Sequence, residues 1–336
     1  MTAQLLTASL LLALVAGCDG PSDRSATSVT ATESQPVTAP ASKVPHKNVA
    51  LVMKTLTNPF FVEVENGARR AETELGFHLI VKAASQETSI EQQIQIVDDL
   101  IRDKVDAIVI APGDSQRLVP VLKRAQAANI TVINIDNRLD PVAVRSEGMK
   151  PVPFVSVDNR LASYQAAKFV ADQIHHPAQV LVIEGIRSAQ NAQDRTAGIE
   201  RALAENKNLR VVSKVSANWK IDEGYLVTKQ AFASHPDIKA VFSANDMMAL
   251  GALRFLAESG KRDVRVASYD AIDDAKAAVK AGTMAVTVDQ QAAQQGYEGA
   301  ALALQALAGK PVPETLLVET RLVTAQTLKV TAQTLN

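Results

Sequence analysis

The chain has 336 residues, 47% of them hydrophobic and 21% charged, which is enough apolar material for the cores of two domains. Its 35 Lys and Arg residues nearly balance its 36 Asp and Glu residues, so the sequence predicts no basic face and no nucleic-acid partner. A single cysteine, Cys18, excludes an intrachain disulfide.

The amino terminus resembles the signal peptide of a bacterial lipoprotein. Leu5–Gly17 is an apolar run shorter than the roughly 20 residues of a transmembrane helix, and it fits the apolar region of a signal peptide. The sequence Val15-Ala16-Gly17-Cys18 is similar to a lipobox, which implies a signal peptide of residues 1–17 and lipidation of Cys18. The alternative interpretation is a cysteine buried in a hydrophobic segment.

Residues 18–46 are rich in Ser, Thr, Ala and Pro and have no hydrophobic period, which predicts a disordered, lipidated tether. Such a tether would hold the following domain outside the membrane while letting it move. An Asp directly after the lipidated cysteine implies retention at the inner membrane in Gram-negative lipoproteins, and Asp19 fits this pattern. We therefore expect a periplasmic, cell-envelope protein that is lipid-anchored to the outer face of the inner (plasma) membrane.

From residue 47 onward, short β-branched runs alternate with amphipathic stretches of helical period. Two consecutive series of this alternation predict an α/β fold of two doubly wound parallel-sheet lobes, with a cleft between their strand ends. The predicted strands are Val49–Met53, Leu79–Ala83, Ala107–Ile110, Thr131–Ile135, Phe154–Val157, Val180–Ile183, Val211–Val215, Ala240–Phe242, Val264–Ala267 and Ala285–Val288. The predicted helices are Pro59–Leu75, Ser89–Lys104, Gln116–Asn129, Leu161–Ile174, Ala192–Glu205, Glu223–Ser234, Asp246–Ser259 and Asp273–Ala281.

The sequence gives little support for catalysis. No predicted strand is followed by the glycine-rich phosphate fingerprint of dinucleotide or nucleotide enzymes. The five histidines lack the spacing of metal ligands or of a base beside a nucleophile. Carboxylates at the strand ends resemble hydrogen-bond acceptors for hydroxyl groups more than an acid–base pair. We expect no catalytic residue, no metal and no cofactor.

The polar segment after the first predicted strand falls at the sheet edge where open α/β folds bind ligands. Pro59 can start a helix there. Lys54, Asn58 and the rings of Phe60 and Phe61 together suit a small, hydroxyl-rich ligand with one apolar face. The alternative is that the two phenylalanines are ordinary core residues.

Polar groups also follow later strands. Asp136 comes directly after the fourth strand, where it would contact a ligand or else cap a helix or initiate a turn. Asn191, Gln193 and Arg195 open the helix after Val180–Ile183. Arg195 would contact a ligand or pair with a carboxylate of its own lobe.

The only tryptophan, Trp219, falls in a polar loop where it would stack on the C–H face of a sugar, core packing being the alternative. Asn245 or Asp246 must cap the helix that begins there, so only one of the two is free for a ligand. Asp270 ends the next strand, where it would bind a ligand or cap a helix, and Gln290 follows the last strand.

The chain resembles the periplasmic sugar-binding proteins of the ribose- and allose-binding type, whose type I solute-binding fold is shared with the LacI-repressor core. The resemblance covers nearly all of residues 47–324. It rests on blocks that occur in order: Lys54–Phe61, Asp194–Gly198, Asn218-Trp219, Val241–Leu253, Tyr269-Asp270 and Val288–Gln290. A lipobox and a tether occupy the place of a DNA-binding helix-turn-helix, so the repressor alternative fails.

The resemblance implies which residues hold a sugar. Those expected to hydrogen-bond its hydroxyls are Asn58, Asp136, Asn245, Asp270 and Gln290, and those expected to enclose its ring are Phe60, Phe61 and Trp219. Lys54 stands where ribose binders carry a small hydroxyl residue, and Asn137 and Gln193 stand where they carry arginines. With Arg195, these three residues are expected to complete the site and to favour a hexose or a polyol over ribose.

In this family the chain crosses between the lobes three times. The resemblance places the crossings near Val157-Asp158, Gln290-Gln291 and Leu322-Val323. The expected N-terminal lobe is 47–157 plus 291–322, and the expected C-terminal lobe is 158–290 plus 323–336. Closure about these hinges would bury the ligand.

The resemblance implies a monomeric, non-enzymatic substrate-binding protein that captures a monosaccharide or polyol and delivers it to the membrane permease of an ABC importer. A sugar-sensing receptor for a chemoreceptor or histidine kinase would share this fold. Some lipoproteins of this fold bind nucleosides, whose base the three aromatic rings could stack. A glycan-cleaving enzyme is the most distant alternative.

Overall fold

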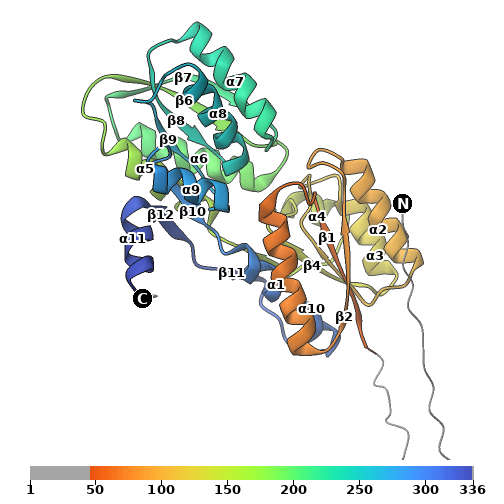
Figure 1. The fold of residues 1–336 in the computed structure, drawn as a ribbon. Helices are drawn as coiled ribbons and strands as arrows, with labels where there is room; N and C mark the ends of the chain where they lie inside the picture. The colour runs from red at the N-terminus through yellow and green to blue at the C-terminus, as the bar shows by residue number, and fades with distance from the viewer. Residues whose placement is uncertain (1–45, 335–336) are drawn as a thin grey trace, which may run out of the picture. The chain divides into compact units, whose positions relative to one another are not determined.

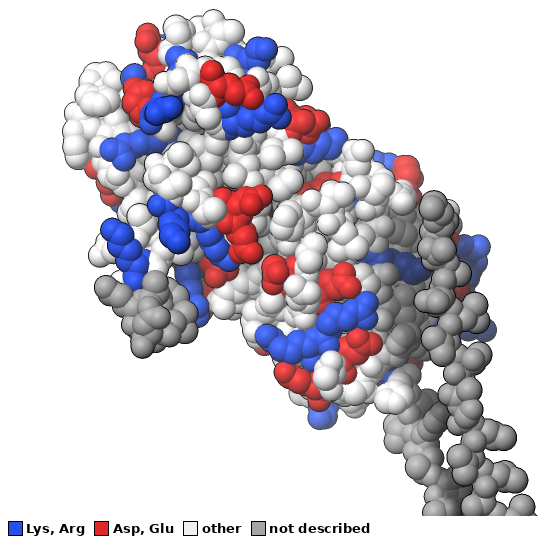
Figure 2. All heavy atoms as spheres, in the orientation of Figure 1, with Lys and Arg blue, Asp and Glu red and all other residues white. Residues whose placement is uncertain are grey.

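The computed structural model of the chain describes residues 46–334. The predicted signal peptide, Cys18 and the predicted tether up to residue 45 lie outside the described residues. Within the described part, no helix combines the length and the apolar composition that crossing a membrane requires. Acidic and basic side chains are interspersed on the face shown in Figure 2, without a continuous basic area there.

The first sheet has six strands in the order β11-β5-β4-β3-β1-β2, and every neighbouring pair is parallel. Its strands are β1 (Asn48–Met53), β2 (His78–Ala83), β3 (Ala107–Ile110), β4 (Thr131–Ile135), β5 (Phe154–Ser156) and β11 (Thr315–Leu317). The order of β1 to β5 is that of a doubly wound flavodoxin-like sheet, to which a strand from far along the chain is added. We call this sheet and its helices the first lobe (Figure 1).

The second sheet repeats the same order of strands as β12-β10-β9-β8-β6-β7. Its strands are β6 (Ala178–Glu184), β7 (Leu209–Ser216), β8 (Ile238–Ser243), β9 (Arg265–Ala267), β10 (Val286–Asp289) and β12 (Arg321–Thr324). All pairs are parallel except β10 and the edge strand β12, which are antiparallel. This sheet and its helices form the second lobe.

Helices cover both faces of each sheet (Figure 1). In the first lobe α1 packs with α10 and α2 packs with α3; in the second lobe α5 packs with α6 and α7 packs with α8. The helices are α1 (Pro59–Leu75), α2 (Ile90–Arg102), α3 (Val119–Ala127), α4 (Pro141–Ser146), α5 (Asn159–Ala171), α6 (Gln190–Ala204), α7 (Ile221–Ser234), α8 (Asp246–Glu258), α9 (Asp273–Ala281), α10 (Ala292–Leu307) and α11 (Ala325–Thr334).

The β1 strand shows why the predicted strands are continuous apolar runs. Successive side chains of a strand point to opposite faces, so Leu51 and Met53 join the core that contains α1, while Ala50 and Val52 join the core that contains α2 and α3. A parallel sheet covered on both faces therefore needs an apolar residue at every position.

The chain passes between the lobes at three places. The first lies between β5 and α5, at Val157 and Asp158, and the second between β10 and α10, at Gln290 and Gln291. The third lies at residues 318–320, between β11 and β12.

The third crossing differs from the expectation at Leu322-Val323. Both residues already belong to β12, where Leu322 pairs with Val288 and Val323 with Thr287 in the second sheet. The first lobe therefore ends at Leu317, and the second lobe resumes at Arg321.

The second crossing returns the chain to the first lobe, where α10 packs against α1 at short range. A Cβ on Gly67 would lie 1.7 Å from the carbonyl oxygen of Ala293, and a Cβ on Gly296 would lie 2.0 Å from the carbonyl oxygen of Val64. Only glycine at these two positions permits the contact between the helix backbones.

We expect Gly296→Ala to lower the free energy of unfolding by about 1–3 kcal/mol, because the added methyl group would push α10 away from α1. Urea unfolding measures the change. Gly299→Ala is the comparison in the same helix, since its Cβ would meet side-chain methyl groups of Ile135 and Val109 at 2.8 and 2.9 Å and no backbone atom, so we expect a smaller loss. An equal loss in both variants would contradict the proposed backbone contact.

Candidate functional site

Residues that follow the strands of both sheets meet in one small cavity. The cavity is narrow, with a volume of about 20 Å³, which is room for about one water molecule. All its lining residues are buried. They are Lys54, Asn58, Phe60, Phe61, Glu87, Asp136, Asn191, Arg195, Trp219, Asn245, Asp270 and Gln290.

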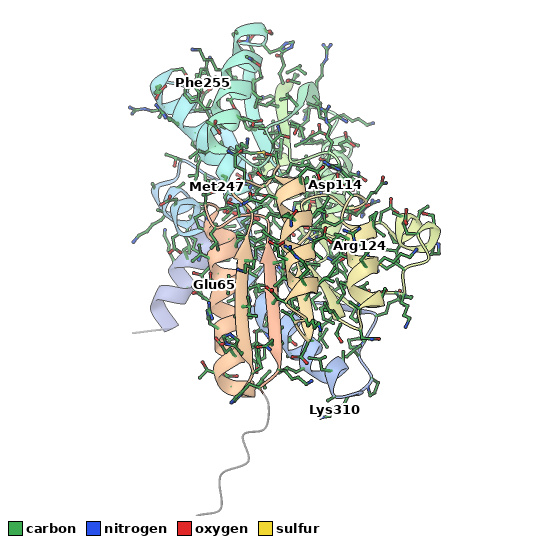
Figure 3. All side chains as sticks on the ribbon, turned by 90° about the vertical axis from the view of Figure 1, so that its right-hand side faces the viewer. Glu65, Asp114, Arg124, Met247, Phe255 and Lys310 are labelled. Atoms are coloured by element: carbon green, nitrogen blue, oxygen red, sulfur yellow. The ribbon has the colours of Figure 1, made fainter. Side chains whose placement is uncertain are left out.

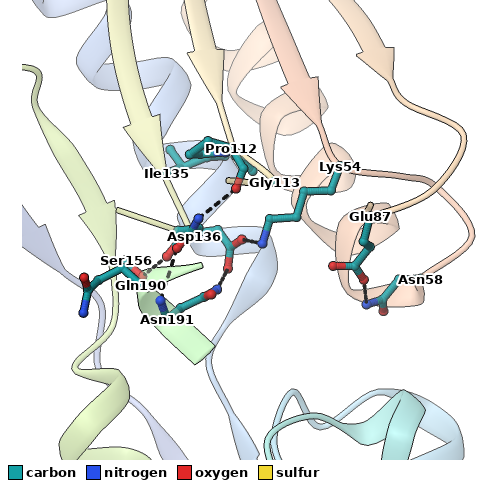
Figure 4. Close-up of polar contacts among 12 residues, drawn as sticks. Lys54, Asn58, Glu87, Pro112, Gly113, Ile135, Asp136, Ser156, Gln190 and Asn191 are labelled. Atoms are coloured by element: carbon teal, nitrogen blue, oxygen red, sulfur yellow. Dashed lines mark hydrogen bonds and ion pairs between the residues drawn. The ribbon is translucent and has the colours of Figure 1, made fainter. Parts of the chain in front are cut away.

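A buried ion pair joins the ends of β1 and β4 in this cavity. Lys54 Nζ lies 2.7 Å from Asp136 Oδ2, and both side chains are 3% exposed. Asp136 has a φ of 60°, a left-handed conformation that costs energy in a non-glycine residue and clusters at binding sites. Its Oδ1 accepts a 3.2 Å hydrogen bond from Asn191 Nδ2 of the second lobe (Figure 4). The carboxylate of Asp136 thus lines the cavity and caps no helix.

The start of α1 places two aromatic rings at the cavity wall. Pro59 is the first helical residue, as the sequence predicts, and Asn58 Oδ1 caps the helix by accepting from the N–H of Phe60 at 3.1 Å. The rings of Phe60 and Phe61 are edge to face, with centroids 5.0 Å apart. Both belong to the buried core and also line the cavity, so they combine the two roles that the sequence leaves as alternatives.

Trp219 forms another aromatic wall from the loop after β7. Its φ is 67°, and its ring lies against the backbone of Gly185, where a Cβ would be 2.1 Å from the indole. The indole Nε1 is buried and has no hydrogen-bond partner among the described residues. A buried N–H group without a partner is costly, so this donor is available to a ligand oxygen.

Arg195 is held inside the second lobe, which is one of the two alternatives that the sequence leaves open. Its Nε donates to Asn159 Oδ1 at 2.8 Å, and its Nη1 donates to the carbonyl of Ala244 at 3.0 Å. The same guanidinium donates to Asp270 Oδ1 and to Gln290 Oε1, each at 3.3 Å. Arg195 therefore fixes two polar side chains of the cavity wall.

Asn245 and Asp246, at the start of α8, have different roles. Asn245 Oδ1 caps the helix by accepting from the N–H of Met248 at 3.0 Å. Asp246 accepts from the N–H of Ile272 at 3.0 Å and from the hydroxyl of Thr287 at 2.8 Å, and burial raises its pKa to about 7. Of the two, Asn245 alone lines the cavity, and its Nδ2 makes no hydrogen bond within residues 46–334.

Two cavity residues are absent from the set that the resemblance implies: Glu87, which the sequence does not single out, and Asn191, which the sequence places only at the start of a helix. Glu87 lies in the loop after β2, and its Oε1 accepts from Asn58 Nδ2 at 2.9 Å (Figure 4). Burial raises the pKa of Glu87 to about 7, with Lys54 acting in the opposite direction. Asn191 Oδ1 is buried without a hydrogen-bond partner in the described part of the chain. The signal that finds Asn191 is its spacing of four residues from Arg195 on one helix face.

Asn137 and Gln193 are expected ligand residues that do not reach the cavity. Asn137 is completely buried; its Nδ2 donates to the carbonyl of Pro112 at 2.9 Å, and its Oδ1 accepts from the N–H of Asn191 at 3.1 Å. Gln193 is exposed and donates to the carbonyl of Arg187 at 2.9 Å. Two residues beyond Asn191 on α6, it points to another side of the helix. We therefore remove both from the expected site.

Two cations and three carboxyl groups line the cavity, and burial raises the pKa of the third carboxyl, Glu87, to about 7. Lys54 is paired with Asp136, and Arg195 lies 3.3 Å from Asp270. Burial raises the pKa of Asp270 well above its usual range, although Arg195 acts in the opposite direction. Because each cation has a carboxyl partner, the cavity suits an uncharged ligand with several hydroxyl groups. In the described range of residues, no group of His, Cys, Asp and Glu could hold a metal ion.

Comparison with known proteins agrees with this architecture. The family pattern described as "Periplasmic binding protein domain" matches residues 49–311. The D-ribose/D-allose-binding protein of Pseudomonas aeruginosa is 40% identical over 279 residues, which cover 82% of this chain and 87% of the relative. This chain belongs to the periplasmic binding proteins, in the ribose- and allose-binding type.

Other members of the family support the same assignment. The ribose import binding protein of Escherichia coli is 33% identical to this periplasmic binding protein over 86% of this chain and 94% of the relative. A solute-binding protein of an ABC transporter from Actinobacillus succinogenes, solved with bound D-allose, is 34% identical with a TM-score of 0.80. The match covers 84% of this chain and 99% of that structure. The expected two-lobe fold is confirmed, and these relatives are binding proteins, not enzymes.

We expect Glu87→Gln to flatten the pH dependence of stability. A carboxyl whose pKa rises from 4.5 to about 7 on folding stabilises the fold when protonated. Its contribution is fully present below about pH 4.5 and is lost as the pH rises through 7. Between pH 5 and pH 8, the unsubstituted protein should therefore lose up to about 3 kcal/mol of unfolding free energy that the variant does not lose.

Urea unfolding at both pH values measures this difference. The control is Glu91→Gln, which makes the same chemical change at an exposed position of α2. A variant whose stability runs parallel to that of the unsubstituted protein would show that Glu87 is ionised in the fold.

Proposed function

We propose that this protein is a lipid-anchored substrate-binding protein of an ABC importer, which captures an uncharged monosaccharide or polyol between its two lobes. It acts as a monomer at the outer face of the inner membrane and presents the closed, ligand-bound form to a membrane permease.

The observation that carries the proposal is the balance of groups in the buried cavity. Three aromatic rings provide apolar walls, and amide and carboxyl groups provide hydrogen-bond partners between them. Aromatic faces cover the C–H patches of a sugar ring, while charged acceptors bind hydroxyl groups strongly. Asn191 Oδ1 and Trp219 Nε1 are buried and unpaired among residues 46–334, so they supply one acceptor and one donor.

The relatives support transport of a sugar. One is a D-ribose/D-allose-binding protein, one is a ribose import binding protein, and one binds D-allose as part of an ABC transporter. One of these relatives is an import binding protein, which favours transport over the sensing alternative. The resemblance of residues 15–18 to a lipobox supports the lipid anchor.

A thermal-shift screen of the purified protein tests the ligand class. The panel holds pentoses, hexoses including allose, inositols, sugar alcohols and nucleosides. A ligand that binds only the folded state at one hundred times its dissociation constant adds about 2.7 kcal/mol of stability. We expect a clear rise in melting temperature with one monosaccharide or polyol. A nucleoside hit would overturn the proposed ligand class, and no shift with any member would overturn the proposed function.

Trp219→Ala is expected to weaken binding of that sugar by at least about tenfold, because it removes an aromatic wall of the cavity. Isothermal titration calorimetry measures the loss. Trp219→Phe keeps an aromatic face and is expected to retain part of the affinity. Full affinity in the alanine variant would mean that the ligand binds elsewhere.

Asp270→Asn is expected to abolish measurable binding in the same titration while leaving the protein folded. The amide keeps the shape of the side chain and an oxygen for Arg195, but it replaces the second carboxyl oxygen with an NH2 group, which cannot accept from a hydroxyl group. Asp270→Ala is the less informative variant, since it would leave the buried guanidinium of Arg195 without its carboxyl partner and destabilise the lobe. Retained affinity in Asp270→Asn would place Asp270 outside the ligand contacts.

A further inference from the structure

Helix α6 of the second lobe has no cap of its own. Its N-cap residue is Ala189, whose side chain makes no capping hydrogen bond. The first N–H groups of a helix need acceptors from outside the helix. Two of these acceptors come from the first lobe: Ser115 Oγ accepts from the N–H of Gln190 at 3.0 Å, and Asn137 Oδ1 accepts from the N–H of Asn191 at 3.1 Å.

Both acceptors are held in place within the first lobe. Asn137 Nδ2 donates to Ser115 Oγ at 3.2 Å, so the two side chains form one unit. Asp114, labelled in Figure 3 beside the second lobe, shapes the loop that carries Ser115. Its Oδ1 accepts from the N–H groups of Gln116 and Arg117, each at 2.8 Å. The acceptors are therefore preorganised to meet α6.

Other contacts between the lobes converge on the same place. The N–H of Ser115 donates to the carbonyl of Ser188 at 3.2 Å, and Asn191 Nδ2 donates to Asp136 Oδ1 at 3.2 Å. Apart from the three crossings, every hydrogen bond that joins described residues of the two lobes involves residues 188–191. The hydrogen bonds between the two lobes are thus concentrated at the start of α6.

We propose that Ser115 and Asn137 form a catch that holds the closed form by capping α6 from the opposite lobe. Neither residue lines the cavity, so the catch stabilises closure without touching the ligand. When the lobes separate, both hydrogen bonds break and water replaces the two acceptors.

This role rests on the proposed function in one respect, namely that the ligand binds the closed form. The apparent dissociation constant then rises in inverse proportion to the fraction of closed protein. The catch therefore sets how tightly any ligand binds and leaves unchanged which ligand is preferred. Ser115 and Asn137 are positioning residues for the lobes.

Titration of two variants tests the effect on affinity. Ser115→Ala and Asn137→Ala are each expected to weaken binding by about three- to tenfold, the effect of losing hydrogen bonds between the lobes. The loss should be equal for the preferred sugar and for the next best, so that the ratio of their dissociation constants is unchanged. Ser89→Ala is the matched control, because Ser89 starts a helix of the same lobe without a capping bond.

Hydrogen exchange of backbone amides provides a second readout, which does not need a ligand. The amides of Gln190 and Asn191 are protected in the closed form by their bonds to Ser115 and Asn137. We expect the amide that loses its acceptor, Gln190 in Ser115→Ala and Asn191 in Asn137→Ala, to exchange about three- to tenfold faster, with the amides of β6 as the reference for the folded lobe.

Unchanged affinity together with unchanged exchange at residues 190 and 191 would overturn the catch. Loss of affinity for one sugar alone would overturn it too, since it would make these residues ligand contacts. If the unsubstituted protein binds no sugar of the panel, the proposed function fails. The exchange measurement still decides in that case whether Ser115 and Asn137 cap α6.

Discussion

A lysine ammonium buried at the end of β1 is tolerable only beside a carboxylate, because removing an unpaired charge from water costs several kcal/mol. Asp136 provides that carboxylate at 2.7 Å from the position directly after β4, where its backbone is left-handed. The same side chain reaches Asn191 in the other lobe. One ion pair therefore fixes two strand ends, shapes the cavity and connects it to the second lobe.

The regular part of the fold can be predicted from the sequence because its strands are buried on both faces. Such strands are continuous apolar runs bounded by turns, so the predicted Val49–Met53 and Thr131–Ile135 agree closely with β1 and β4. The strands β11 and β12 have only three and four residues, mostly not buried. Their place is decided by pairing with distant strands, which a local pattern does not contain. The misplaced third crossing follows from this.

The position of a polar residue directly after a strand predicts many of the cavity residues. Where this prediction is wrong, there is a physical cause. Gln193 follows the right strand but lies on the wrong side of α6, a distinction that helical period supplies. Asn137 adjoins Asp136, yet its side chain is used to hold the backbone of Pro112 and Asn191. Glu87 lies in a polar loop where nothing in the sequence separates it from its neighbours. Its carboxyl group is hydrogen-bonded to Asn58, which comes from a different part of the chain.

The return of the chain through α10 has a consequence for the order of folding. The side of α1 that carries Gly67 is covered by a helix that begins at Ala292, and the edge of the first sheet is completed by β11 at Thr315. During synthesis, α1 and its sheet have no such cover until nearly the whole second lobe has been made. Contacts so distant in sequence are also slow to form. The first lobe, whose strands come first in the sequence, thus completes its core only after every strand of the second lobe except β12 has been made.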